Sequence, residues 1–125
     1  MSKSLADDVL DAACDKIATG TILTVCSDEP SDRSEAVTTY ALADGTLTPG
    51  DGNGDFTIAD GDTSGRKVTV AAQEDLVIDE SGTATHVAIC DNTSLLLVTT
   101  CSSQALTQGG TVTVGTFKCE IRDPS

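Results

Sequence analysis

The sequence is poor in aromatic and in basic residues. It has no tryptophan, one tyrosine and two phenylalanines among 125 residues. Seven Lys and Arg stand against twenty Asp and Glu, which gives a formal net charge of −13. Nucleic acids and anionic membrane surfaces are bound through clustered basic residues, so we expect neither as a direct partner. The shortage of aromatic rings also disfavours a carbohydrate-binding module, because few rings are available to stack on a sugar.

Several chemical and targeting motifs are missing as well. No apolar run approaches the ~20 residues of a membrane span, and residues 1–8 contain no apolar signal core. We therefore expect synthesis in the cytoplasm without export by a signal peptide. The chain has one histidine and no Cys-x-x-Cys pair, which argues against a zinc site. It has neither a phosphate-binding glycine loop with lysine nor a nucleophile elbow, so we predict no cofactor and no enzymatic activity.

The residues that are abundant favour strands. Threonine occurs 19 times and, with Val and Ile, is typical of pleated, half-buried surfaces. Seven or eight short extended segments separated by Gly, Asp and Asn turns predict an antiparallel β-sandwich or a partly open barrel. We expect one domain over residues 1–125, mainly β, with one N-terminal α-helix over about 4–19 and a β-rich body over 21–122.

The helix is predicted from spacing and from its ends. Ser4 is a suitable N-cap, and Gly20 is a suitable C-terminal stop. Asp7, Asp11 and Asp15 fall on a face that we expect to be solvated. The apolar stripe that should face the core consists of Leu5, Val9, Leu10, Ala13, Cys14 and Ile17.

Beyond Gly20 the apolar residues no longer recur at helical spacing but at every second residue, as in a strand. In the last strand, Phe117, Cys119 and Ile121 should face the core, and Gly115 suggests a bulge before it. The expected strands cover residues 21–26, 37–43, 66–72, 83–90 and 95–101, and residues 111–114 and 116–121 form one last strand or two. Residues 56–59 and 77–79 are shorter extended pieces.

Five cysteines are an unusually high number for a chain without an export signal. A hairpin that turns at residues 91–94 separates Cys90 from Cys101 by roughly 17–20 Å, too far for a disulfide within one chain. Cys26, Cys90 and Cys101 each end a predicted strand, where a neighbouring molecule can reach them. We therefore expect these three to form interchain disulfides first, followed by Cys14 and Cys119, which also suit core positions. Reduced structural thiols and metal binding are the alternatives.

The loop over residues 51–62 resembles a calcium loop in part. Asp51, Asn53 and Asp55 occupy positions 1, 3 and 5, and Asp62 occupies position 12. Position 6 is Phe56 where glycine is required, and position 12 lacks the bidentate glutamate. We interpret this segment as a solvated turn, with calcium as a weaker alternative and no other metal predicted.

The single histidine, His86, lies in the middle of a predicted strand. A Cys–His nucleophile pair needs a thiol beside it, and the sequence places none there. We expect a half-buried or exposed strand histidine without a catalytic role.

Four stretches carry a resemblance to a known group of proteins. The phrases at residues 5–13, 60–70 and 82–89, and the ending with residues 109–114 and 121–124, resemble small proteins encoded among the virion genes of tailed bacteriophages. The resemblance implies a small β-rich structural component of the particle, such as a minor or decoration capsid protein. The cysteine content departs from that group and points to a covalently reinforced shell.

The resemblance also implies partners and a location. The chain would be made in the host cytoplasm, reside in the virion, bind the major capsid protein and other virion proteins, and form a homo-oligomer. A neck, collar or tail component is the alternative, and its copy number would be far lower. A receptor-binding module is a further alternative from a different class.

Overall fold

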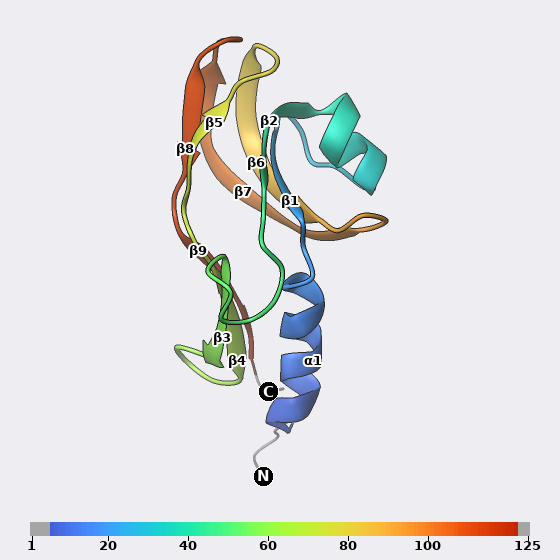
Figure 1. The fold of residues 1–125 in the computed structure, drawn as a ribbon, viewed down its shortest axis with the longest axis vertical. Coiled ribbons are helices and arrows are strands. Elements are labelled where there is room, and N and C mark those ends of the chain that lie inside the picture. Colours follow the sequence, from blue (N-terminus) through green and yellow to red (C-terminus); the bar gives the residue numbers. More distant parts are fainter. Residues whose placement is uncertain (1–5, 123–125) are drawn as a thin grey trace.

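The protein is mainly β, with antiparallel sheets and one N-terminal α-helix, as the composition predicts (Figure 1). The computed structural model describes residues 6–122. The elements are α1 (Asp7–Ile17), β1 (Ile22–Cys26), the π-helical turn η1 (Glu35–Thr39), β2 (Ala41–Thr46), β3 (Phe56–Asp60), β4 (Arg66–Val70), β5 (Gln73–Val77), β6 (Gly82–Cys90), β7 (Leu95–Leu106), β8 (Thr111–Val114) and β9 (Phe117–Ile121).

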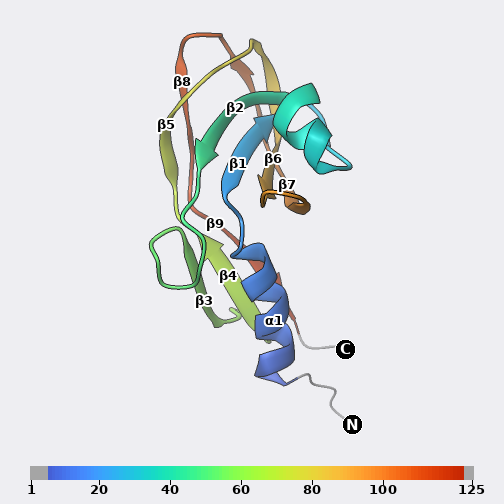
Figure 2. The same cartoon turned by 45° about the vertical axis from the view of Figure 1, so that its right-hand side comes forward.

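Three antiparallel sheets build the body, in the manner of a sandwich or open barrel. The first has strand order β2-β1-β6-β7, the second β3-β4-β9 and the third β5-β8. An isolated bridge between Ala43 of β2 and Ile78, the residue after β5, joins the first sheet to the end of the third. Strands β8 and β9 follow one another as a long strip that connects the third sheet to the second (Figure 2).

One continuous core lies between these layers. It gathers Leu23 and Val25 of β1, Val68 and Val70 of β4, and side chains from α1, β2, β3, β5 and β6. Phe56 is the largest fully buried side chain in it. Phe117, Cys119 and Ile121 pack against this core, which confirms the predicted direction of the last strand.

The helix lies where it was predicted, but fewer of its residues are buried than predicted. Its buried residues are Leu10 and Cys14, with Ile17 half-buried, whereas Val9 is 56% exposed. The predicted cap Ser4 lies outside the described residues. Gly20 is not the helix stop, because α1 ends at Ile17 and Gly20 lies three residues further on.

Asp11 was expected on a solvated helix face, and this is wrong. The Arg66 guanidinium donates through Nε to Asp11 Oδ1 at 2.6 Å and through Nη1 to Asp60 at 2.7 Å. The helix is thereby tied to the start of β4, against which it also packs. None of the helices in residues 6–122 has the length and apolarity of a membrane-spanning helix.

Other strand predictions need correction. Residues 37–40, predicted as extended, belong to η1 and its end, and β2 begins only at Ala41. The short extended piece expected over 77–79 lies earlier, as β5. Gly115 separates two strands with different partners instead of forming a bulge within one, since β8 pairs with β5 and β9 with β4.

Candidate functional site

The longest strand, β7, is an open sheet edge. Among the described strands it is bonded to β6 alone, from Leu95 to Leu106, with register shifts that leave Leu96 and residues 101–103 without a β6 partner. The sequence predicted an end at Cys101, but pairs such as Ala84 with Gln104 and Gly82 with Leu106 extend the hairpin. The 91–94 turn is confirmed, with Asp91 N donating to Ser94 O at 3.0 Å. An unpaired edge exposes backbone N–H and C=O groups that another strand can bond.

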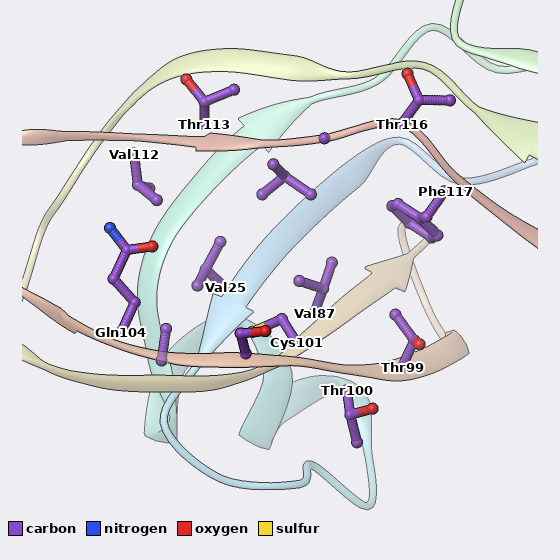
Figure 3. A pocket seen from close by; sticks show the side chains of 14 residues that line it. Val25, Val87, Thr99, Thr100, Cys101, Gln104, Val112, Thr113, Thr116 and Phe117 are labelled. Carbon is purple, nitrogen blue, oxygen red and sulfur yellow. The ribbon is translucent and has the colours of Figure 1, made fainter.

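A groove runs beside this edge, and we call it the β7 groove. It encloses a cavity of about 360 Å³, with β7 on one side and the β8–β9 strip on the other. Figure 3 shows Val25 and Val87 between the two ribbons, with Gln104 on β7 and Val112 and Phe117 on the opposite side. Because Val25 and Val87 are almost completely buried, the groove floor is part of the main core.

The groove and its rims carry no charge. From Asn92 to Phe117 the sequence contains no Asp, Glu, Lys, Arg or His, although 22% of the whole chain is charged. Proteins usually protect a long edge strand with charged residues, proline or bulges; β7 has no charge and no proline, and only its two register shifts interrupt the edge. This uncharged stretch is the signal that would have identified the site from the sequence.

All five cysteines are free thiols, and they differ sharply in accessibility. Cys101 is exposed on β7 and lines the β7 groove, and Cys119 is half-buried on β9. Cys14, Cys26 and Cys90 have 0% exposure. The expectation that Cys26 and Cys90 lie at accessible rims is therefore wrong, whereas Cys101 is accessible.

The segment after β1 explains the burial of two of these thiols. Residues 27–40 fold over the outer face of the four-stranded sheet, where Cys26, Ala36, Ala88 and Cys90 form a second small core. Cys26 Sγ donates to the Ala36 carbonyl oxygen at 3.5 Å and lies 3.4 Å from Thr24 Oγ1. Burial raises the pKa of both the Cys26 and the Cys90 thiol, so both are protonated and shielded at neutral pH.

His86 has a thiol as its cross-strand partner. Its register partner on β1 is Cys26 and on β7 is Thr100. The imidazole Nδ1 is 2.8 Å from Thr85 Oγ1, while the Cys26 thiol is held by Thr24 and Ala36. The pair lacks the thiol–imidazole hydrogen bond that activates a nucleophile, and the thiol is buried.

The residues of the predicted calcium loop each make hydrogen bonds to different partners in the protein. Asp51 Oδ1 accepts from Ile58 N, and the two oxygens of Asp55 accept from Thr48 N and Gln73 Nε2. Asn53 Nδ2 donates to the Pro49 carbonyl. Within residues 6–122 no three His, Cys, Asp or Glu side chains gather as a metal site.

Asp62 belongs to an ion-pair cluster on the three-stranded sheet. It accepts hydrogen bonds from Lys118 and, at 2.7 Å, from Lys67. The bond from Lys118, followed by that from Lys67, lowers the pKa of Asp62 from 3.8 to about 2. Asp62 is thus a structural ion-pair partner of these two lysines.

We expect the five thiols to react in the order of their exposure. With iodoacetamide, Cys101 should be alkylated first and Cys119 more slowly, and Cys14, Cys26 and Cys90 only after unfolding. Although Cys101 is exposed, partial desolvation of its sulfur raises the pKa of the thiol, so its alkylation rate should increase as the pH rises through the neutral and mildly alkaline range. Peptide mass spectrometry after timed labelling measures each site, and a sample in denaturant is the control. Equal rates for Cys101 and Cys90 in the folded protein would contradict the order.

Comparison with protein-family models, curated proteins and solved structures finds no match to this chain.

Proposed function

We propose that this protein is a non-enzymatic structural subunit of a tailed-phage particle. It docks on another virion protein along the β7 groove, with the major capsid protein as the principal partner, and Cys101 reinforces the contact by an interchain disulfide. The observation that carries the proposal is the open, uncharged edge β7, with an accessible thiol, in a chain with a net charge of −13. The virion assignment itself depends on the resemblance of the sequence to phage virion proteins.

Physical chemistry supports a docking role for the groove. Strand addition to an open edge supplies backbone hydrogen bonds, and pockets beside the edge accept alternate side chains. The floor made by Val25 and Val87 offers apolar contact to such side chains. The acidic remainder of the surface keeps the subunit soluble and disfavours association elsewhere.

The crosslinking part differs from the sequence-based expectation. Cys26 and Cys90 are fully buried, so a disulfide from either needs the chain to open locally. Cys101 needs no such opening, and Cys119 is the next most accessible thiol. The interchain bond is therefore assigned to Cys101.

Gel electrophoresis of intact particles tests this function. Particles of the phage that encodes the chain are purified and run with and without reductant, then probed with an antibody to the chain. We expect larger bands that collapse to 12.7 kDa on reduction. Particles with Cys101→Ser should give the 12.7 kDa band under both conditions, and particles with the control Cys119→Ser should keep the larger bands.

Two outcomes contradict the proposal at different points. Absence of the chain from purified particles removes the virion assignment. A 12.7 kDa band without reductant removes the crosslink. The number of copies per particle then separates a shell protein from a neck, collar or tail component.

A further inference from the structure

One Asn-Gly pair lies in the exposed loop between β2 and β3. Asn53 and Gly54 are both exposed, and Gly54 has a φ of 115°, a conformation that glycine adopts without strain. Asparagine is a thermolabile residue, because the backbone nitrogen that follows it can attack its side-chain amide. Glycine hinders this attack least, since it has no Cβ. Even a Cβ at Gly54 would meet no atom within 4 Å, so the two reacting groups have room to approach one another.

The backbone nitrogen of Gly54 is available for this attack. The Gly54 N–H donates a hydrogen bond to no atom of residues 6–122. Two Asp-Gly pairs nearby differ in this respect. Gly52 N donates to the Phe56 carbonyl oxygen at 2.9 Å, and the third Asp-Gly pair of the chain lies within β2. Gly61 N donates to the Gly65 carbonyl oxygen, also at 2.9 Å. A nitrogen that is held by an acceptor must first leave it before it can react.

The other asparagine of the chain, Asn92, is exposed as well but is protected in two ways. It precedes Thr93, whose β-branched side chain restricts the approach of the backbone nitrogen to the side-chain amide. The Thr93 N–H also donates to Asp91 Oδ1 at 2.8 Å. The structure therefore distinguishes Asn53 from Asn92 by the neighbour and by the state of the nitrogen that would attack.

We infer that Asn53 is a site of spontaneous modification, at which the chain converts its own asparagine to aspartate and isoaspartate. The Gly54 nitrogen loses its proton to hydroxide and attacks Cγ of Asn53. The new N–C bond closes a succinimide ring, and the side-chain nitrogen takes up a proton and leaves as ammonia. Water then opens the ring at either carbonyl carbon, which gives aspartate or isoaspartate. Water is the only co-reactant, and the inference does not depend on the proposed function.

One hydrogen bond opposes the reaction. Asn53 Nδ2 donates to the Pro49 carbonyl oxygen at 2.8 Å, and this bond must break before the amide can turn toward Gly54. Because the bond lies on the exposed surface, water replaces it at small cost. The product cannot make it again, since a carboxylate has no N–H to donate.

The modification alters a loop that is bonded to the end of α1 (Figure 2). Gly50 N donates to the Ala18 carbonyl oxygen at 2.8 Å, and Thr48 N donates to Asp55 Oδ2 at 2.6 Å. The new carboxylate stands in the sequence between Asp51 and Asp55, and like charges repel one another. Isoaspartate also lengthens the main chain by one carbon atom. We therefore expect the conversion to weaken the bonds that hold this loop to the end of α1.

The test is a timed incubation of the purified full-length chain at mildly alkaline pH, followed by peptide mapping with mass spectrometry. Deamidation exchanges NH₂ for OH and adds one negative charge, so ion exchange separates the modified chain. We expect conversion at Asn53 and none at Asn92 in the same samples. The rate should rise with pH, because the attacking nitrogen must lose its proton. The variant Asn53→Gln, which would have to close a larger ring, should stay unmodified.

Thr93→Gly is the variant that separates the effect of the sequence from that of the fold. It gives Asn92 the same following residue as Asn53, while the N–H of residue 93 keeps Asp91 as its acceptor. In the folded variant Asn92 should react about fivefold more slowly than Asn53, the factor that one ordinary hydrogen bond represents. In denaturant, where this bond is lost, the two asparagines should react at similar rates.

Hydrogen exchange of the separated forms measures the consequence for the loop. The amides of Thr48 and Gly50 should exchange faster in the isoaspartate form than in the unmodified chain, and Asn53→Asp shows the effect of the charge alone. An Asn53 that stays intact in the folded wild type would overturn the inference. Equal rates for the two asparagines in folded Thr93→Gly would show that the free N–H of Gly54 does not select the site. Unchanged exchange at Thr48 and Gly50 would remove the effect on the loop.

Discussion

Truncation of Phe56 to alanine is expected to lower the free energy of unfolding by about 3–5 kcal/mol, the range for deletion of a buried aromatic ring. Phe56 has 0% exposure and begins β3, where it pairs with Val70. Its ring lies so close to Gly20 that a Cβ there would be 3.3 Å from it. The cavity left by truncation would open where the end of α1 approaches β3, so the surroundings cannot collapse onto it without moving the helix.

The two phenylalanines of the chain form a matched pair for this measurement. Phe117 is half-buried and lines the β7 groove, so Phe117→Ala removes less apolar contact and should lower the free energy of unfolding by about 1–2 kcal/mol. Phe56→Leu retains most of the buried volume and should lower it by about 1 kcal/mol. Urea unfolding followed by circular dichroism gives all three values. Equal losses for Phe56→Ala and Phe117→Ala would contradict the burial of the Phe56 ring.

The positions of the strands illustrate what the sequence was able to predict. The segments over β1, β3, β4, β6 and β9 were recognised within one or two residues, because they are rich in Val, Ile and Thr and are bounded by turn residues. The segment at 37–40 was not, although its Val, Thr and Tyr residues favour a strand. Local polar bonds prevail there: Glu35 N donates to Asp32 Oδ1 at 2.8 Å, and Ser31 N and Oγ donate to Glu35 Oε1.

The candidate site was predictable only in part. Cys101 was identified as an accessible thiol, but the length of β7 was not, since Ser102 and Ser103 are typical of a turn and only pairing with β6 extends the strand to Leu106. The burial of Cys26 and Cys90 depends on a tertiary contact, the folding of residues 27–40 over the sheet, which no local pattern encodes. Hydrophobic period gives the face of a strand but does not reveal whether a distant segment covers that face.

Substitution of Gly65 by alanine is expected to lower the free energy of unfolding by about 2–5 kcal/mol, from a left-handed backbone and a steric overlap together. Gly65 has a φ of 70° in the turn between β3 and β4. A Cβ at this position would overlap the carbonyl oxygen of Ile121 and lie 2.9 Å from its carbonyl carbon. Since both atoms belong to the backbone of β9, the overlap can be relieved only if β9 moves away from β4.

A second glycine separates the contribution of the left-handed backbone from that of the steric overlap. Gly52 has a φ of 81°, and a Cβ there meets no atom within 4 Å, so Gly52→Ala should show the backbone contribution alone, about 1–2 kcal/mol. Hydrogen exchange adds a local measurement, because the amides that pair β4 with β9, over Phe117–Ile121, should lose protection in Gly65→Ala and keep it in Gly52→Ala. Equal destabilisation by the two substitutions, with β9 protection unchanged in both, would show that the close approach of β9 to this turn is not present in solution. Loss of protection confined to Gly65→Ala would show that the turn at Gly65 holds β9, and with it the lower end of the β8–β9 strip that bounds the β7 groove.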